Sequence, residues 1–247
     1  MAVIELNGLT KTYGRVRAVD DLTFTVPPGR VTGFVGANGA GKTTTMRMLL
    51  GLTRPTAGTA LVDGRQYVDL PHPVRTIGAL VDPDVFHPNR SGRNALRVIA
   101  RASDIPDRRV DEVLDLVGLA EAGGRRVGGF SMGMRQRLAL AAALLGDPET
   151  LLLDEPGNGL DPQGMHWLRG LIRSMAAEGR TIFLSSHLLA ELAQTVDEVV
   201  IIADGRLVTQ QPMAGLVDSS RGASLEEVYL RLTDLAPSQP EQTQDMP

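Results

Sequence analysis

The chain has 247 residues, of which 43% are hydrophobic and none is cysteine. This length and apolar content suffice for one large domain or two small ones, and the absence of cysteine excludes disulfides and thiol chemistry. The formal net charge of −4 argues against a nucleic-acid-binding protein, because such proteins carry a basic surplus. We find no secretory leader and no apolar run of about 18 residues, so we expect neither secretion nor a membrane span.

The first fifth of the chain predicts short strands. Residues 3–6 and the alternating segment 22–26 favour strands, and the Pro-Pro-Gly sequence at 27–29 interrupts them. A further apolar run at 31–35 leads through a glycine-rich turn into a helical segment that includes residues 46–50. The order strand, glycine-rich turn and helix is the setting that a phosphate-binding loop requires.

The rest of the chain alternates strands with helices. Helical periodicity marks residues 83–147, Asp204 and Gly205 predict a hairpin turn, and Ser224 to Glu227 predicts a capping box for a last helix through Leu232. Strand-like runs occupy residues 59–62, 77–81, 151–153, 181–184 and 199–202. This alternation predicts an α/β fold with a mainly parallel core sheet, an N-terminal antiparallel β-subdomain and an α-helical insertion. We expect one domain over residues 1–236 and a disordered polar tail over 237–247.

The phosphate-binding motif is the most specific signal. Its glycines allow the backbone to wrap a polyphosphate, Lys42 would reach the β- and γ-phosphates, and the Thr43 hydroxyl would ligate Mg²⁺. Only two lysines, Lys11 and Lys42, occur among 25 basic residues. In a chain that otherwise uses arginine, a lysine at position 42 supplies the compact ammonium that binds phosphate as a point charge. The predicted ATP-binding residues of this loop are Gly36, Asn38, Gly39, Ala40, Gly41, Lys42, Thr43 and Thr44.

Two carboxylates follow the predicted strand at 151–153. Asp154 comes directly after it, where a strand-terminal Asp beside a phosphate loop can hold Mg²⁺. Glu155 is one residue further on and could orient or deprotonate a water. We therefore predict Asp154 as a metal ligand and Glu155 as a catalytic residue.

Further motifs in the same order resemble the ATP-binding cassette (ABC) ATPases from about residue 3 to residue 232. Residues 130–138 look like the signature motif of this family, 156–162 like its D-loop, and 184–187 like the segment that carries its switch histidine. Tyr13 matches the aromatic residue that stacks on adenine. The resemblance implies an ATPase with ATP and Mg²⁺ as cofactors.

The resemblance also implies roles for single residues. Ser131 and Gly133, at the start of a helix, would grip the γ-phosphate of ATP held by a second subunit, so that each active site is shared. His187 would donate to the γ-phosphate and act with Glu155 and Lys42 in catalysis. Asp161, in the D-loop, is included among the ATP-binding residues.

Two departures from the usual family pattern indicate which subfamily the chain resembles. The signature has Met132 and Met134 in place of a glycine and a glutamine, and Asp82 stands where a glutamine is usual. Both changes are similar to the ATPases of bacitracin- and daunorubicin-type resistance exporters. Asp82 is a candidate ligand of Mg²⁺ and its waters, and the alternative is that it caps the strand end at Pro83.

The resemblance implies a cytoplasmic ATPase subunit that dimerises with a second copy and drives ABC-2-type export of a drug, antibiotic or lipid-like compound. It would reach the inner face of the membrane only through permease subunits that dock near residues 82–88 and the helical insertion. Two alternatives remain open. An ABC ATPase that acts on nucleic acid or ribosomes would need a coiled-coil insertion, zinc cysteines or a second cassette, and a purely regulatory module would be expected to lose Glu155 or His187.

Overall fold

The computed structural model describes residues 3–187, 192–219 and 223–234. The tail expected at 237–247 lies outside them. The strands are β1 (Ile4–Tyr13), β2 (Val16–Val26), β3 (Val31–Val35), β4 (Ala57–Val62), β5 (Ile77–Leu80), β6 (Thr150–Leu153), β7 (Thr181–Ser186), β8 (Glu198–Ala203) and β9 (Arg206–Pro212). The α-helices are α1 (Lys42–Leu49), α2 (Pro73–Thr76), α3 (Gly92–Ala102), α4 (Asp107–Leu116), α5 (Met132–Leu144), α6 (Pro162–Ala177), α8 (Met213–Ser219) and α9 (Leu225–Asp234).

The core sheet is mainly parallel, with the strand order β5-β6-β7-β3-β8-β9. The strands β5, β6, β7, β3 and β8 run parallel, and β9 returns antiparallel to β8 through the predicted turn at Asp204 and Gly205. Val35 at the end of β3 pairs with Ser186 of β7, and Leu153 of β6 pairs with Leu184. The residues that follow β3, β6 and β7 are therefore brought together at one edge of the sheet.

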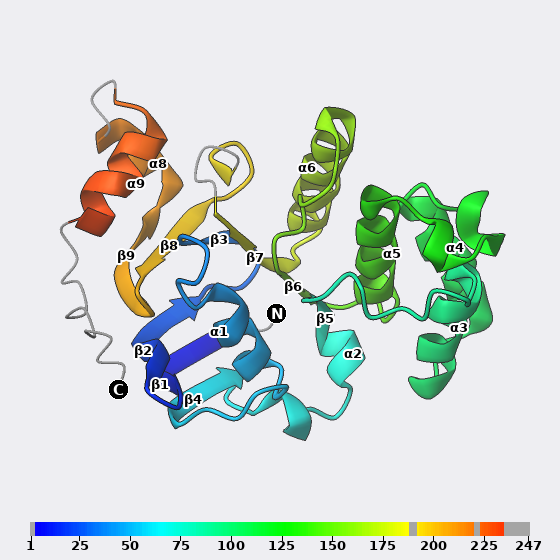
Figure 1. Cartoon of the computed structure of the whole chain (residues 1–247), viewed down its shortest axis with the longest axis horizontal. Helices are drawn as coiled ribbons and strands as arrows, with labels where there is room; N and C mark the ends of the chain where they lie inside the picture. Colours follow the sequence, from blue (N-terminus) through cyan, green and yellow to red (C-terminus); the bar gives the residue numbers. More distant parts are fainter. Residues whose placement is uncertain (1–2, 188–191, 220–222, 235–247) are drawn as a thin grey trace, which may run out of the picture.

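A separate antiparallel sheet, in the order β2-β1-β4, contains the N-terminus of the described chain. β1 and β2 are longer than the apolar pattern predicts, because their backbone pairing continues to Tyr13 and Val16, where the side chains are exposed. Figure 1 places this sheet and α1 on one side of the molecule, away from α3 to α5. The predicted antiparallel subdomain is confirmed.

Apolar residues on both faces of the core sheet are buried. On one face, Phe34 of β3 and Phe183 of β7 meet Phe24 of β2, with ring centroids 5.2 to 5.9 Å apart. On the opposite face, the strands pack against α5 and α6 through residues such as Leu138 and Leu168. Since both faces are covered, the parallel strands are apolar throughout, as such sheets require.

The helices α3, α4 and α5 lie within the segment predicted as a helical insertion and project to one side in Figure 1. The third of these helices, α5, begins at Met132, directly after Ser131, whose hydroxyl accepts a hydrogen bond from the Met134 N–H at 3.2 Å. The predicted capping box before α9 is confirmed: Ser224 and Glu227 exchange hydrogen bonds of 3.0 and 3.2 Å. Periodicity gave no prediction for α6.

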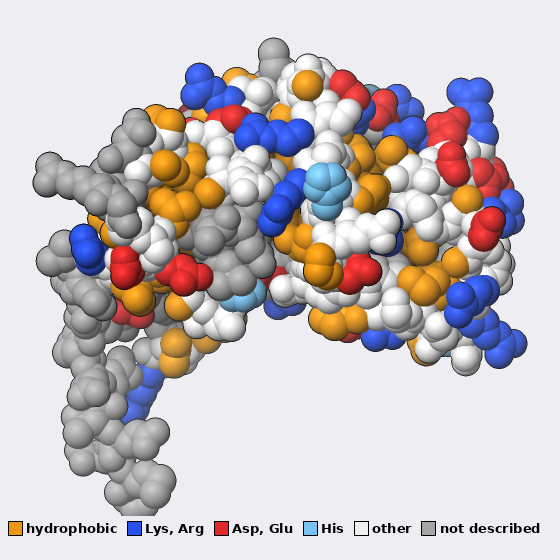
Figure 2. Space-filling view, turned by 90° about the horizontal axis from the view of Figure 1, so that it is seen from above, with side chains coloured by type: hydrophobic (Ala, Val, Ile, Leu, Met, Phe, Trp, Pro, Cys, Tyr) orange, Lys and Arg blue, Asp and Glu red, His pale blue; other side chains and the backbone are white. Residues whose placement is uncertain are grey.

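The molecular surface mixes charges of both signs. Figure 2 shows acidic and basic side chains interspersed over the end that carries the α3 to α5 helices. Several of them form ion pairs, for example Arg93 with Asp111 at 2.7 Å. Within the described ranges, no helix is both long and apolar enough to cross a bilayer.

Candidate nucleotide-binding site

The loop between β3 and α1 has a backbone shape that needs glycine. Gly39 and Gly41 have φ angles of 85° and 102°, in the region that side chains disfavour. A Cβ at Gly41 would lie 2.5 Å from the Ala18 oxygen, and one at Gly36 would lie 2.8 Å from the Ile202 oxygen. Neighbouring backbone on both sides therefore fixes the path of this loop.

The loop forms a pocket suited to an anion. The first turn of α1 begins at Gly41 without a side-chain cap from the described residues, so its N–H groups and helix dipole face the pocket. The Lys42 ammonium is buried and donates to the carbonyl oxygens of Gly36 at 2.6 Å and Ala37 at 3.2 Å. The pocket measures about 170 Å³ and is lined by Asn38, Gly39, Gly41, Lys42, Thr43, Thr44 and Glu155. A buried cation beside a helix N-terminus fits the polyphosphate that the sequence predicts.

Thr43 and Asp154, the predicted metal ligands, are in contact. The Thr43 hydroxyl donates to Asp154 Oδ2 at 2.6 Å, and the Ser185 hydroxyl donates to Oδ1 at 2.5 Å. The described residues contain no cluster of three or more acidic or histidine side chains that could hold a metal. A hydroxyl beside one carboxylate nevertheless fits Mg²⁺, which is usually held by one or two protein groups together with phosphate and water.

Glu155 lies between the two other predicted catalytic residues. Its Oε2 is 2.9 Å from His187 Nδ1, and its Oε1 is 3.4 Å from Lys42 Nζ. Oε1 is buried and takes part in no hydrogen bond with the described residues, so it remains able to accept a proton or a water. The φ angle of Glu155 is 46°, a strained conformation for a residue with a side chain, and such strain often occurs at functional sites.

The remaining predicted residues do not line this pocket. Ser131 caps α5, and Asp161 caps α6 by accepting the Gly164 N–H at 2.7 Å. Tyr13 is 50% exposed at the tip of the β1–β2 hairpin, with the Lys11 ammonium 4.9 Å from its ring centroid. The other two are Gly133, where an added Cβ would lie 3.0 Å from the Gly159 oxygen, and Asp82, which is exposed.

Asp82 has a local hydrogen bond in the structure. Its Oδ1 accepts the Asp84 N–H at 2.9 Å, which closes the turn around Pro83. This is the capping role considered above as the alternative to a metal ligand. The ligand role remains a proposal.

Sequence motifs missed three residues that support the site. Ser185 orders both carboxylates, since its hydroxyl donates to Asp154 and also accepts the Glu155 N–H at 2.8 Å. Gln136 of α5 is buried and donates to the Glu155 carbonyl at 3.1 Å. Its position in the signature segment was the only available signal.

Tyr229 of α9 is the third such residue. Burial raises the pKa of its phenol, and the nearby Ala37 backbone opposes that shift. The last described helix thus lies close to the phosphate loop. No motif could reveal a contact between residues so far apart in sequence.

Comparisons with known proteins agree with this geometry. The family model for the ABC transporter matches residues 19–158. The chain is 45% identical to the bacitracin transport ATP-binding protein BcrA of Bacillus licheniformis over 222 residues, which cover 89% of this chain and 72% of that protein. The chain belongs to the ABC transporter family. The predicted resemblance to bacitracin-type ATPases is confirmed, and ATP hydrolysis coupled to transport is the activity of this ABC ATPase.

Other relatives and solved structures extend the match over the whole cassette. The lantibiotic transport ATP-binding protein SrtF of Streptococcus pyogenes is 33% identical over 92% of this chain and 96% of its own length. A solved ATP-binding subunit of an ABC transporter has a TM-score of 0.82 at 30% identity, covering 94% of this chain and 99% of that chain. A dimeric bacterial ABC transporter cassette has a TM-score of 0.77 at 21% identity and shares the fold, covering 85% of this chain and 98% of its own.

Proposed function

We propose that this ABC ATPase binds Mg·ATP at the loop from Gly36 to Thr44 and that Glu155 is the catalytic base. The observation that supports this most directly is the placement of Glu155 between Lys42 and His187, at 3.4 and 2.9 Å. Glu155 would take a proton from the attacking water, because its Oε1 has no other hydrogen bond from the described residues. Lys42 would stabilise negative charge on the transferred phosphoryl group, and His187 would hold Glu155 and contact the γ-phosphate.

Thr43 and Asp154 would hold the magnesium ion, which neutralises charge on the phosphates. Asp154 is already oriented by the hydroxyls of Thr43 and Ser185. Asp82 would add an outer ligand to its water shell. Such a position requires Asp82 to keep or exchange its hydrogen bond with the Asp84 N–H.

Two copies of the chain would share each ATP. Ser131 and Gly133 lie at the N-terminus of α5, but neither lines the phosphate pocket of its own chain. Because a helix N-terminus attracts anions, these residues suit the γ-phosphate on a second copy. Tyr13 would stack on the adenine in its own chain, and Asp161 would act where the two copies meet.

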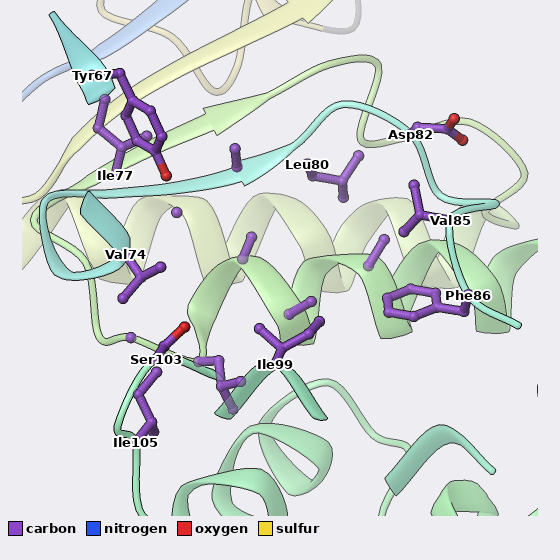
Figure 3. A pocket seen from close by; sticks show the side chains of 17 residues that line it. Tyr67, Val74, Ile77, Leu80, Asp82, Val85, Phe86, Ile99, Ser103 and Ile105 are labelled. Atoms are coloured by element: carbon purple, nitrogen blue, oxygen red, sulfur yellow. The ribbon is translucent and has the colours of Figure 1, made fainter. Parts of the chain in front are cut away.

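The permease would dock beside β5. A cavity of about 250 Å³ lies between β5, the segment after it, α3 and α5. Figure 3 shows Val85, Phe86 and Ile99 pointing into this space, while the Asp82 carboxylate lies at its outer end. The mainly apolar lining suits an amphipathic segment of a membrane subunit, and its closeness to Asp82 would link docking to the nucleotide. The chain would thus associate with the inner face of the membrane through that partner.

The cargo would be exported and would resemble an antibiotic peptide. The relatives named above transport bacitracin and a lantibiotic, and this chain matches most of the length of each. Their transport roles favour this proposal over an ATPase that acts on nucleic acid or ribosomes, or over a regulatory module.

Resistance of a host strain tests the export role. The chain should be produced together with a membrane protein encoded in an adjacent reading frame, in a strain susceptible to bacitracin and lantibiotics, with Glu155→Gln as the matched control. We expect a higher inhibitory concentration of one of these peptides with the unaltered chain only. Equal susceptibility to both peptides with both chains, when both assemble with the permease, would contradict export of this cargo class.

A further inference from the structure

Asp20 of β2 is a buried carboxylate held by two arginines outside the phosphate pocket. Its side chain is 7% exposed, Arg17 Nη1 donates to Oδ1 at 2.8 Å, and Arg206 Nε donates to Oδ2 at 2.7 Å. Burial by itself would raise the pKa of Asp20, but the hydrogen bonds from Arg206 and Arg17 outweigh it and hold the pKa below its ordinary value. Asp20 is therefore charged at neutral pH and paired on both oxygens.

Through Arg206 and its own backbone, Asp20 is connected to the phosphate loop. Arg206 begins β9, directly after the turn at Asp204 and Gly205. The Asp20 N–H donates to the Gly205 carbonyl at 2.9 Å, and the Gly205 N–H donates to the Ala40 carbonyl at 3.2 Å. One short path of hydrogen bonds thus runs from β2 through the β8–β9 turn to the loop.

The backbone contacts along this path leave no room for side chains. A Cβ at Gly205 would lie 2.9 Å from the Ala18 oxygen, and one at Gly41 would lie 2.5 Å from the same oxygen. The β2 backbone just before Asp20 therefore packs against both the turn and the phosphate loop. In so tight a contact, small shifts of β2 change the geometry of its neighbours.

Through Arg17, Asp20 is connected to the other end of the nucleotide site. Arg17 lies opposite Thr12 in the β1–β2 register, and Thr12 precedes Tyr13 at the tip of the hairpin. Asp20 thus lies between the strand end that carries Tyr13 and the turn behind the phosphate loop.

We propose that Asp20 is a positioning residue for ATP: through Arg17 and Arg206 it fixes the hairpin tip that carries Tyr13 relative to the phosphate loop. One nucleotide can then place its adenine and its phosphates at the two ends together. The role deepens the nucleotide site proposed above and rests on the adenine contact of Tyr13. Asp20 itself does not line the phosphate pocket.

This role predicts a selective defect. Asp20→Asn removes the charge that holds both arginines but keeps the backbone bond from residue 20 to Gly205, so the phosphate loop keeps its support. A ligand that contacts only the loop should bind with normal affinity. ATP should bind more weakly, because Tyr13 is no longer held in place to contact the adenine. Inorganic tripolyphosphate is such a ligand.

The experiment measures the binding of Mg·ATP and of magnesium tripolyphosphate by titration calorimetry, together with KM and kcat for ATP. For Asp20→Asn we expect ATP affinity to fall about tenfold, with a matching rise in KM and a nearly unchanged kcat, because a misplaced binding group weakens productive binding. Tripolyphosphate affinity should stay within about twofold. Arg206→Gln should give the same pattern, and since the Arg206 side chain is 49% exposed, this variant serves if Asp20→Asn does not fold.

Asp111→Asn is the matched control. It breaks the ion pair of 2.7 Å with Arg93 in the helical region and should change the affinity for neither ATP nor tripolyphosphate. Tyr13→Ala should weaken the binding of ATP but not the binding of tripolyphosphate. If Tyr13→Ala keeps full ATP affinity, the adenine contact of the proposed function is wrong and this proposal fails with it. The positioning role alone is overturned if Tyr13→Ala weakens ATP binding but the folded Asp20 and Arg206 variants do not. It is also overturned if those variants weaken the binding of ATP and of tripolyphosphate equally.

Discussion

The Lys42 ammonium and the Glu155 carboxylate form an ion pair of 3.4 Å across the phosphate pocket. The Lys42 side chain is 5% exposed and that of Glu155 is 18% exposed, so the two charges neutralise each other in a site partly shielded from water. We expect a polyphosphate that enters the pocket to replace Glu155 as the charged partner of Lys42. The carboxylate would then be left beside the substrate, where the proposed mechanism needs a base.

Replacing Glu155 by Gln should separate binding from hydrolysis. The amide keeps the side-chain shape but cannot take a proton, so hydrolysis should fall by about 10²–10⁴-fold. ATP should bind at least as tightly as in the unaltered protein, because Lys42 loses a competing anion, and the protein should accumulate as an ATP-bound dimer. Light scattering with Mg·ATP measures this. Glu112→Gln, which alters an exposed carboxylate paired with Arg109, is the control and should behave as the unaltered protein. A Glu155→Gln protein that turns over ATP at the normal rate would exclude Glu155 as the base.

Replacing Lys42 by Ala should abolish tight ATP binding. The charge-assisted contacts that Lys42 supplies are worth about 1.5–3 kcal/mol each, and no other lysine is near in sequence. Lys42→Arg is the informative comparison, because it keeps the charge but replaces the compact ammonium that bonds the Gly36 and Ala37 carbonyls with a larger planar group. We expect both variants to bind fluorescent ATP analogues weakly. Affinity within a few-fold of the unaltered protein in Lys42→Ala would remove Lys42 from the site.

The sequence was sufficient to predict the fold class and the meeting of Thr43 with Asp154 and of Glu155 with His187. Asp154 and Glu155 follow β6, His187 follows β7, and Thr43 follows the loop after β3. These three strands are consecutive and parallel in the sheet, so their carboxyl ends share one edge. It was not sufficient for the Asp20–Arg206 pair, because 186 residues separate the partners and nothing in either segment specifies their packing. The sequence placed Ser131 and Gly133 at the start of α5, but the first residue of the helix, Met132, is set by the Ser131 cap and not by apolar periodicity.

Asp82→Ala tests whether this residue belongs to the metal site. A carboxylate near the phosphates is poorly tolerated unless the cation is close, so its loss should raise the Mg²⁺ concentration needed for half-maximal hydrolysis. The structure gives Asp82 a second role in the turn, through the Asp84 N–H. Asp82→Asn is the control for that role, since its amide oxygen can still accept this bond. A normal Mg²⁺ dependence in both variants would leave only the capping role.

Met132 is expected to couple the signature helix to the D-loop. A Cβ at Gly159 would lie 2.5 Å from Met132 Cγ, so the Met132 side chain packs directly on Gly159 of the same chain. Met132→Gly, which restores the residue usual in the family, should loosen this contact. We expect kcat to fall about three- to tenfold, which corresponds to about 1 kcal/mol of lost transition-state stabilisation, with little change in ATP affinity. Met132→Leu should preserve the rate. Normal kcat in Met132→Gly would mean that the contact does not affect turnover.

A mixing experiment tests whether two chains share each active site. Ser131→Arg places a cation at the N-terminus of α5, against the helix dipole, but leaves the phosphate loop of its own chain intact, whereas Lys42→Ala has the reverse defect. Each variant alone should be inactive. A mixed dimer combines one intact loop with one intact signature helix, so mixing should restore part of the ATPase activity if one site is enough for turnover.

Two controls make the mixing result decisive. Crosslinking should first show that mixed dimers form, since absent activity without them would reflect assembly and not catalysis. A mixture of Lys42→Ala with Glu155→Gln then provides the opposite expectation: both defects lie in the half-site that each chain supplies with its phosphate loop, so no complete site arises and activity should stay at background. Recovery with Ser131→Arg but not with Glu155→Gln would support the shared site. Background activity in both mixtures, with mixed dimers present, would show that the sites are not shared in this way or that both must be intact for turnover.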